Sequence, residues 1–178
     1  MRYLAVDFGA RRIGLAVSDE SETLATPHST RQREGTRRDV EAIIQAVRGL
    51  GAEGVVFGLP RALGGGPGEG EEAARAFAAQ LQQALSAANL SIEIAWWDER
   101  FSTREALSRM RDAGISQKRG RDANDGSSTD ARAAAVILQG FLDSRKMAAD
   151  GAAFDSSRYS VSDGEAKPDS IGRVEDDG

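Results

Sequence analysis

The 178-residue sequence contains no cysteine and a single histidine, His28. The absence of cysteine excludes disulfide bonds, thiolate zinc sites, iron–sulfur clusters and a cysteine nucleophile. One histidine excludes metal sites built from several imidazoles, and a Ser-His-Asp hydrolase would have to use His28. Any catalysis therefore rests largely on carboxylates, hydroxyls, basic side chains or a bound cofactor.

The sequence also lacks a run of about 18 apolar residues, so we expect no membrane-spanning segment. The apolar start at residues 1–6 reaches an acid at Asp7 and contains no signal-peptide core, which makes a cytoplasmic protein the default expectation. The formal charge is −5, from 23 basic and 28 acidic residues. Taken alone, this net charge argues against a generic nucleic-acid binder. The charge of single segments of the chain can differ from this total.

Apolar spacing along the chain predicts a mixed α/β fold in residues 1–143. Short apolar or alternating runs indicate five strands, at residues 2–7, 12–18, 23–30, 54–57 and 91–97. Helical spacing indicates four helices, at residues 36–50, 71–88, 102–113 and 129–142. We therefore predict an antiparallel meander followed by parallel strands, with helices on both faces of the sheet and Pro27 in an edge strand.

The C-terminal segment, residues 144–178, differs in composition from the rest of the chain. It holds five basic and eight acidic residues, and Ser, Asp and Gly dominate it without a hydrophobic period. This pattern predicts an acidic, disordered tail.

Carboxylates at the ends of predicted elements are the candidate catalytic groups. Asp7 ends an apolar strand, where a carboxylate is costly unless it meets a cation or hydrogen-bond donors; an Asx-turn is the alternative. Asp98 and Glu99 follow the strand at residues 91–97 and face opposite ways, so one of them can point where Asp7 points. A solvated strand end is the alternative there.

A third carboxylate, Asp130, stands in the first turn of the last predicted helix, where free amides and the helix dipole stabilise it. Simple capping of the helix is the alternative role, and Asp122 and Asp125 in the preceding loop are competing candidates. Acids that converge from separate elements can bind Mg²⁺ or Mn²⁺ and so activate water against a phosphodiester.

Basic residues gather in two segments despite the negative total. Residues 100–121 contain seven basic and two acidic residues, and residues 31–38 contain four arginines and one glutamate. Dense arginine beside candidate metal-binding carboxylates fits a phosphodiester substrate, although a solvated helix face is the usual meaning of a charge run.

Four sequence blocks, in order, resemble the YqgF/RuvX family: MRYLAVDFGARRIGLAVSD at residues 1–19, VVFGLPRALGG at 55–65, DERFSTREA at 98–106 and DARAAAVILQGFLD at 130–143. The resemblance implies an RNase H-like fold and a bacterial cytoplasmic nuclease. Two activities are assigned to the family, processing of the 5′ end of pre-16S ribosomal RNA and Holliday junction resolution.

The resemblance also implies roles for single residues. Asp7, Glu99 and Asp130 match the family's acids and would bind Mg²⁺ or Mn²⁺, with Asp98 as the reserve candidate. Nucleic acid would be held by basic residues of the hairpin and of the 100–121 segment: Arg11, Arg12, Arg100, Arg104, Lys118 and Arg119.

The sequence departs from the family pattern at three places. Ala10 replaces a hydroxyl residue, the loop before Asp130 is long, and Ala133 and Ala134 stand where RuvC-type enzymes carry a second helix acid. Because the predicted site has fewer acids to bind metal, a non-catalytic RNA-binding assembly factor is an alternative function. Branched DNA as substrate would require two active sites, so a homodimer stays an open option.

Overall fold

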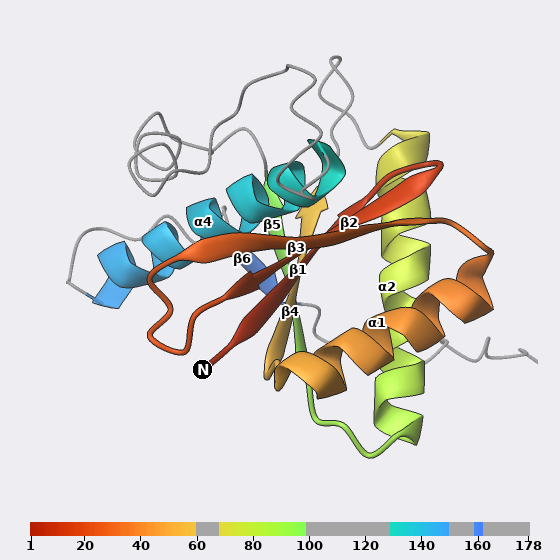
Figure 1. The fold of residues 1–178 in the computed structure, drawn as a ribbon, viewed down its shortest axis with the longest axis horizontal. Coiled ribbons are helices and arrows are strands. Elements are labelled where there is room, and N and C mark those ends of the chain that lie inside the picture. Colours follow the sequence, from red (N-terminus) through yellow and green to blue (C-terminus); the bar gives the residue numbers. More distant parts are fainter. Residues whose placement is uncertain (60–67, 99–128, 150–158, 162–178) are drawn as a thin grey trace, which may run out of the picture.

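The computed structural model describes residues 1–59, 68–98, 129–149 and 159–161 (Figure 1). In these ranges the strands are β1 (Tyr3–Phe8), β2 (Arg12–Ser18), β3 (Ala25–Gln32), β4 (Gly54–Leu59), β5 (Glu93–Asp98) and β6 (Tyr159–Val161). The helices are α1 (Thr36–Leu50), α2 (Glu69–Ala87) and α4 (Thr129–Ala149). The helix predicted at residues 102–113 lies outside the described residues.

The strands form one mixed sheet in the order β3-β2-β1-β4-β5-β6. Pairing is antiparallel from β3 to β1 and parallel from β1 through β4 to β5, which confirms the predicted meander and parallel half. Pro27 lies in the edge strand β3, as predicted. The sheet has one strand more than predicted, because the three-residue β6 pairs antiparallel with β5 and is too short to show a hydrophobic period.

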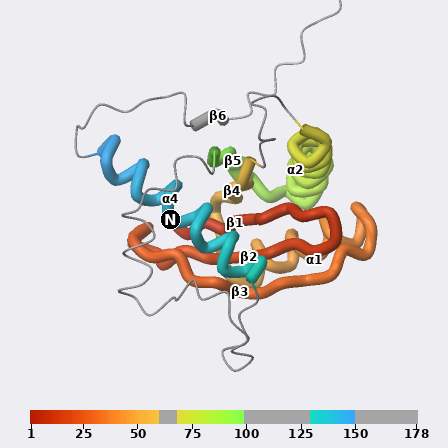
Figure 2. Tube along the Cα trace, turned by 90° about the horizontal axis from the view of Figure 1, so that it is seen from above, coloured from red at the N-terminus to blue at the C-terminus, as the bar shows by residue number. Residues whose placement is uncertain are grey.

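Helices cover both faces of the sheet, and alternation along the strands gives each face its own core (Figure 2). On one face α1 and α2 pack over residues such as Val6 and Trp96. On the other face α4 packs over Tyr3, Ala5 and Trp97. Both tryptophans are buried in these cores. In the described part of the chain, no helix is long and apolar enough to cross a membrane.

Helix α4 is anchored to the sheet through a buried amide at its centre. Gln139 accepts a hydrogen bond from the Ala25 amide at 3.0 Å and donates one to the Thr23 carbonyl at 3.0 Å. The helix extends to Ala149, seven residues beyond the predicted end at residue 142. Because the helix is rigid, the hydrogen bonds of Gln139 also fix the position of the N-terminal turn of α4 over β1 and β2.

The connection between β2 and β3 is closed by the carboxylate of Asp19. This group accepts hydrogen bonds from the amides of Thr23 at 2.7 Å and Leu24 at 2.9 Å, and from the Ser21 hydroxyl. Partial burial acts to raise the pKa of Asp19, but these hydrogen bonds outweigh it and lower the pKa from its ordinary value. The stabilisation is therefore present at neutral pH and lost as pH falls through the folded-state pKa.

We expect Asp19→Asn to lower the free energy of unfolding by about 1 kcal/mol at pH 7. Because the wild-type carboxylate protonates in acid, the difference between the two proteins should shrink as pH falls below about 4. Urea unfolding of both proteins between pH 3 and pH 7 measures this, with the exposed Glu20→Gln variant as control. A difference that stays constant with pH would contradict the assigned role of the charge.

Candidate functional site

Asp7 lies near the carboxyl end of β1, a strand with neighbours on both sides. It is half-buried, and alternation places it on the face of Tyr3 and Ala5, which is the face that α4 covers. Its cross-strand partner on β2 is Gly14. Directly opposed residues of an antiparallel pair have Cα atoms about 4.5–5.5 Å apart, so whatever covers Gly14 also lies beside Asp7.

Asp130 is the residue that covers Gly14. A Cβ atom built on Gly14 would lie 2.0 Å from the Asp130 carbonyl oxygen and 3.0 Å from the Ala131 amide nitrogen. Only glycine therefore allows the first turn of α4 to rest directly on the backbone of β2. The backbone of Asp130 thus lies on the residue that pairs with Asp7, although 122 intervening residues separate the two acids in the sequence.

Arg12 completes this arrangement from the start of β2. Its Nε lies 2.6 Å from the Asp130 Oδ2, and the side chains are 55% and 25% exposed respectively. Arg11, at the tip of the β1–β2 hairpin, is exposed. The hairpin thus presents one guanidinium group, that of Arg12, beside the carboxylate of Asp130. Positive charge next to candidate metal-binding carboxylates is the pattern expected for holding a phosphodiester.

Asp98 ends β5 on the opposite face of the sheet. Ile94 and Trp96 lie four and two residues before Asp98, so all three side chains face the same side of the sheet. Ile94 and Trp96 pack in the core under α1 and α2, and Asp98 itself is 5% exposed. Asp98 therefore does not point where Asp7 points. The predicted ligand Glu99 lies outside the described residues, as do Arg100, Arg104, Lys118 and Arg119, together with the competing acids Asp122 and Asp125.

The chemistry of the described residues suits a hard divalent cation. Asp7 and Asp130 offer carboxylate oxygens, the donors that Mg²⁺ and Mn²⁺ prefer. Within the described ranges no group of three or more His, Cys, Asp or Glu residues is placed to hold a metal ion. The described pair is therefore two parts of the predicted three-acid set.

Sequence reasoning misses Gly14, although its signal is present. A glycine inside a strand pattern indicates a bulge or a close approach of another backbone. The alternation of Ile13, Leu15 and Val17 indicates an apolar face, and the glycine between them reads as a small spacer. The structure shows instead that Gly14 is the point where the first turn of α4 contacts β2.

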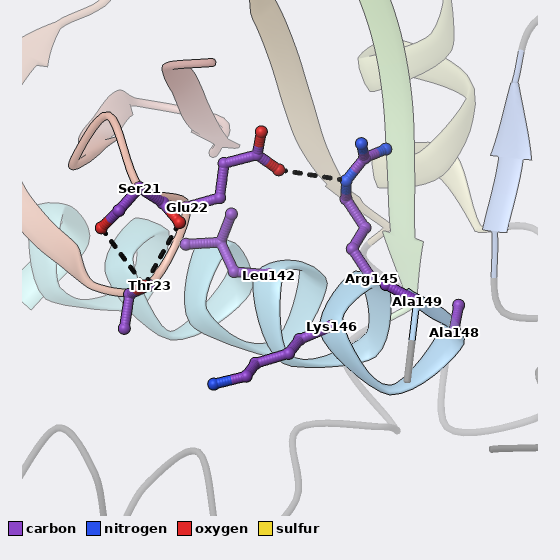
Figure 3. A pocket seen from close by; sticks show the side chains of 8 residues that line it. All are labelled: Ser21, Glu22, Thr23, Leu142, Arg145, Lys146, Ala148 and Ala149. Carbon is purple, nitrogen blue, oxygen red and sulfur yellow. Dashed lines mark hydrogen bonds and ion pairs between the residues drawn. The ribbon is translucent and has the colours of Figure 1, made fainter. Parts of the chain in front are cut away.

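A cavity of about 630 Å³ lies at the other end of α4, near its C-terminus (Figure 3). An ion pair crosses part of it, with Glu22 Oε2 at 3.5 Å from Arg145 Nε. Asp130 lies 15 residues earlier on the same helix, about 22 Å away at 1.5 Å per residue. The cavity is thus separate from the acidic site. Its lining consists of Ser21, Glu22, Thr23, Leu142, Arg145, Lys146, Ala148 and Ala149.

The arrangement of strands and helices is similar to that of two solved RuvC structures. Thermus thermophilus RuvC, solved in complex with Holliday junction substrate, is similar with a TM-score of 0.55 and 12% identity, over 82% of this chain and 96% of that chain. A second Thermus thermophilus RuvC structure is similar with a TM-score of 0.51 and 14% identity. At these identities the likeness defines the fold, which is the RNase H-like class that the sequence predicts.

Sequence comparison defines the family within that class. The family model described as RuvX: Holliday junction resolvase matches residues 1–144. Relatives named "Putative pre-16S rRNA nuclease" include one from Paramagnetospirillum magneticum, 40% identical over 81% of this chain and 86% of the relative. Another, from Anaeromyxobacter dehalogenans, is 41% identical over 82% of this chain and 98% of the relative. The chain belongs to the RuvX family.

Proposed function

We propose that this chain is a divalent-metal-dependent endonuclease that processes the 5′ end of pre-16S ribosomal RNA. The observation that supports the proposal is the packing of the first turn of α4 on Gly14, the pairing partner of Asp7, with Arg12 ion-paired to Asp130. Two carboxylates held on rigid elements next to exposed arginine form a site for a metal and a phosphodiester. The names of the relatives supply the choice of RNA substrate.

The metal ligands in this proposal are Asp7, Asp130 and Glu99. Strand alternation supports Glu99 over Asp98, because Asp98 occupies the face away from Asp7. When bound, Mg²⁺ or Mn²⁺ supplies activation of water and stabilisation of the charge on the leaving oxygen. The chain's own contribution is to hold the carboxylates in place before substrate arrives, so little reorganisation is needed during the reaction.

Arg12 has two tasks in this proposal. Its ion pair with Asp130 fixes the orientation of that carboxylate, and its charge attracts the phosphodiester. Arg11 and the basic residues of the 100–121 segment, Arg100, Arg104, Lys118 and Arg119, extend the contact along the backbone of the substrate.

Cleavage of a four-way DNA junction is a second candidate activity, favoured by the description of the family model as a Holliday junction resolvase. This reaction needs two active sites that cut symmetric strands, so it requires a homodimer. A non-catalytic RNA-binding factor is the third candidate, because Ala134, one turn after Asp130, is fully buried and offers no further ligand.

The test is to incubate the purified protein with a 5′ precursor fragment of 16S RNA and, in parallel, with a four-way DNA junction. Reactions contain Mg²⁺, Mn²⁺ or excess EDTA, and light scattering measures the oligomeric state. We expect metal-dependent cleavage of the RNA at one position and a fall of at least about 1000-fold on chelation. Preferential cleavage of the junction by a dimer would select the second candidate, and binding without any metal-dependent product would select the third.

A further inference from the structure

Positive charge gathers around the connection from β3 to α1, outside the acidic site. Residues 31–41 contain four arginines and three carboxylates, a net charge of +1. In a chain with a net charge of −5, this is a local excess of positive charge. The four arginines of the segment are Arg31, Arg33, Arg37 and Arg38.

This arginine cluster lies at the same end of the sheet as Asp7. Phe8, the residue after Asp7, pairs with Ile13, and Ile13 pairs with Arg31. Because adjacent strands lie about 4.8 Å apart, the Cα atoms of Phe8 and Arg31 are about 10 Å apart. Figure 1 shows the β1–β2 hairpin and the β3–α1 connection at this common end. The arginines therefore share this end of the sheet with Asp7, but they lie on the face that α1 covers, because Phe8 and Ile13 pack in the core of that face.

A fully buried carboxylate, Asp39 in the first turn of α1, organises the cluster. Its Oδ1 accepts a hydrogen bond from the Glu34 amide at 3.0 Å, and its Oδ2 accepts one from Arg33 Nε at 3.3 Å. Arg31 Nε lies 4.0 Å from Oδ1. A carboxylate with no exposure is tolerated only when it is paired, so Asp39 and the two arginines form one unit.

Arg33 is held on a second side by an aromatic ring. Its guanidinium carbon lies 4.3 Å from the centroid of the Phe8 ring, a cation–π contact. Within the described part of the chain, these contacts use Nε and one face of the guanidinium, while 24% of the Arg33 side chain stays exposed. The two terminal nitrogens of the Arg33 guanidinium can bind a phosphate through two parallel hydrogen bonds.

We propose that the arginine cluster, in which Asp39 holds Arg31 and Arg33 in place, binds the phosphodiester backbone of the substrate a short distance from the cleaved bond. The inference rests on the proposed nuclease function, whose site it extends to the face that α1 covers. An acidic protein surface would also meet arginines, but the end of the sheet shared with Asp7 favours nucleic acid. Arg31 and Arg33 would then be binding residues, and Asp39 would be a positioning residue that acts through them.

Binding is measured by fluorescence anisotropy in EDTA, with a labelled 5′ precursor fragment of 16S RNA and a labelled four-way DNA junction. We expect Arg33→Ala to weaken binding of the RNA about 3–10-fold and to reduce the salt dependence of binding by about one phosphate contact. Arg33→Ala/Asp39→Asn keeps an acceptor for the Glu34 amide without an unpaired charge, so it tests the same loss if the single variant folds poorly. Arg48→Ala, an exposed arginine at the other end of α1, is the matched control.

Cleavage by the same variants separates this proposal from the proposed function. At saturating RNA, we expect Arg33→Ala to keep kcat within about twofold while KM rises with the loss of binding. Unchanged binding of both nucleic acids by the folded variants would overturn the proposal, even if the wild type cleaves RNA, and would leave an acidic protein as the partner. Binding that depends on Arg33 in a wild-type protein that cleaves nothing would support the surface and refute the nuclease function alone.

Discussion

Replacing Asp7 by asparagine is expected to reduce the rate of cleavage at least about 1000-fold, a loss of about 4 kcal/mol of transition-state stabilisation. Asparagine keeps the size of the side chain but removes the charge that a divalent cation requires. Because the substitution is nearly isosteric at a half-buried position, we expect the free energy of unfolding to change by less than about 1 kcal/mol. Single-turnover cleavage and urea unfolding measure the two effects separately.

The matched comparison for this prediction is Asp98→Asn, the same chemical change at the end of β5. Asp98 lies on the opposite face of the sheet, so this variant should keep cleavage within about tenfold of the wild type if it folds. Full activity in Asp7→Asn under the same metal concentration would refute the role of Asp7. If a folded Asp98→Asn variant loses activity, then the metal ligand at the end of β5 is Asp98 and not Glu99.

Most of the fold is predictable from the sequence because its signals are local. The predicted bounds of α1 agree with the structure at both ends, since apolar residues at helical spacing and Gly51 at its C-cap define them within a few residues. The predicted end of α4 is too early, because the last turns are exposed and carry no apolar stripe beyond Leu142. The strand β6 is not predictable, because pairing with β5 decides it and a three-residue segment has no pattern of its own.

The candidate site is predictable only in part, for a similar reason. Each acid is recognisable by its place at the end of an element, so the sequence alone indicates Asp7 and Asp130 as candidates. Their proximity depends on the register that sets Asp7 against Gly14 and on the packing of α4 over that glycine. The arrangement around Asp39 has no sequence signal, because Asp39 reads as an ordinary acid in the first turn of a helix.

Replacing Gly14 by alanine is expected to damage both folding and cleavage. The new Cβ would lie 2.0 Å from the Asp130 carbonyl oxygen, whereas ordinary contact begins at 3.4 Å, so helix and strand have to separate by more than 1 Å. Overpacking of this kind costs about 1–3 kcal/mol in the free energy of unfolding. Because Asp130 moves with the helix, a displacement of about 1 Å is expected to lower kcat about 100-fold in the molecules that remain folded.

Gly49→Ala is the control, because a Cβ at Gly49 in α1 meets nothing within 4 Å. That variant should be as stable as the wild type or slightly more stable, since alanine is the better helix former, and its cleavage should not change. Measurements at a temperature where Gly14→Ala is fully folded separate the loss of geometry from the loss of folded protein. If the folded Gly14→Ala variant cleaves at the wild-type rate, then the close approach of Asp130 to β2 serves packing alone and the acids do not have to meet across this glycine.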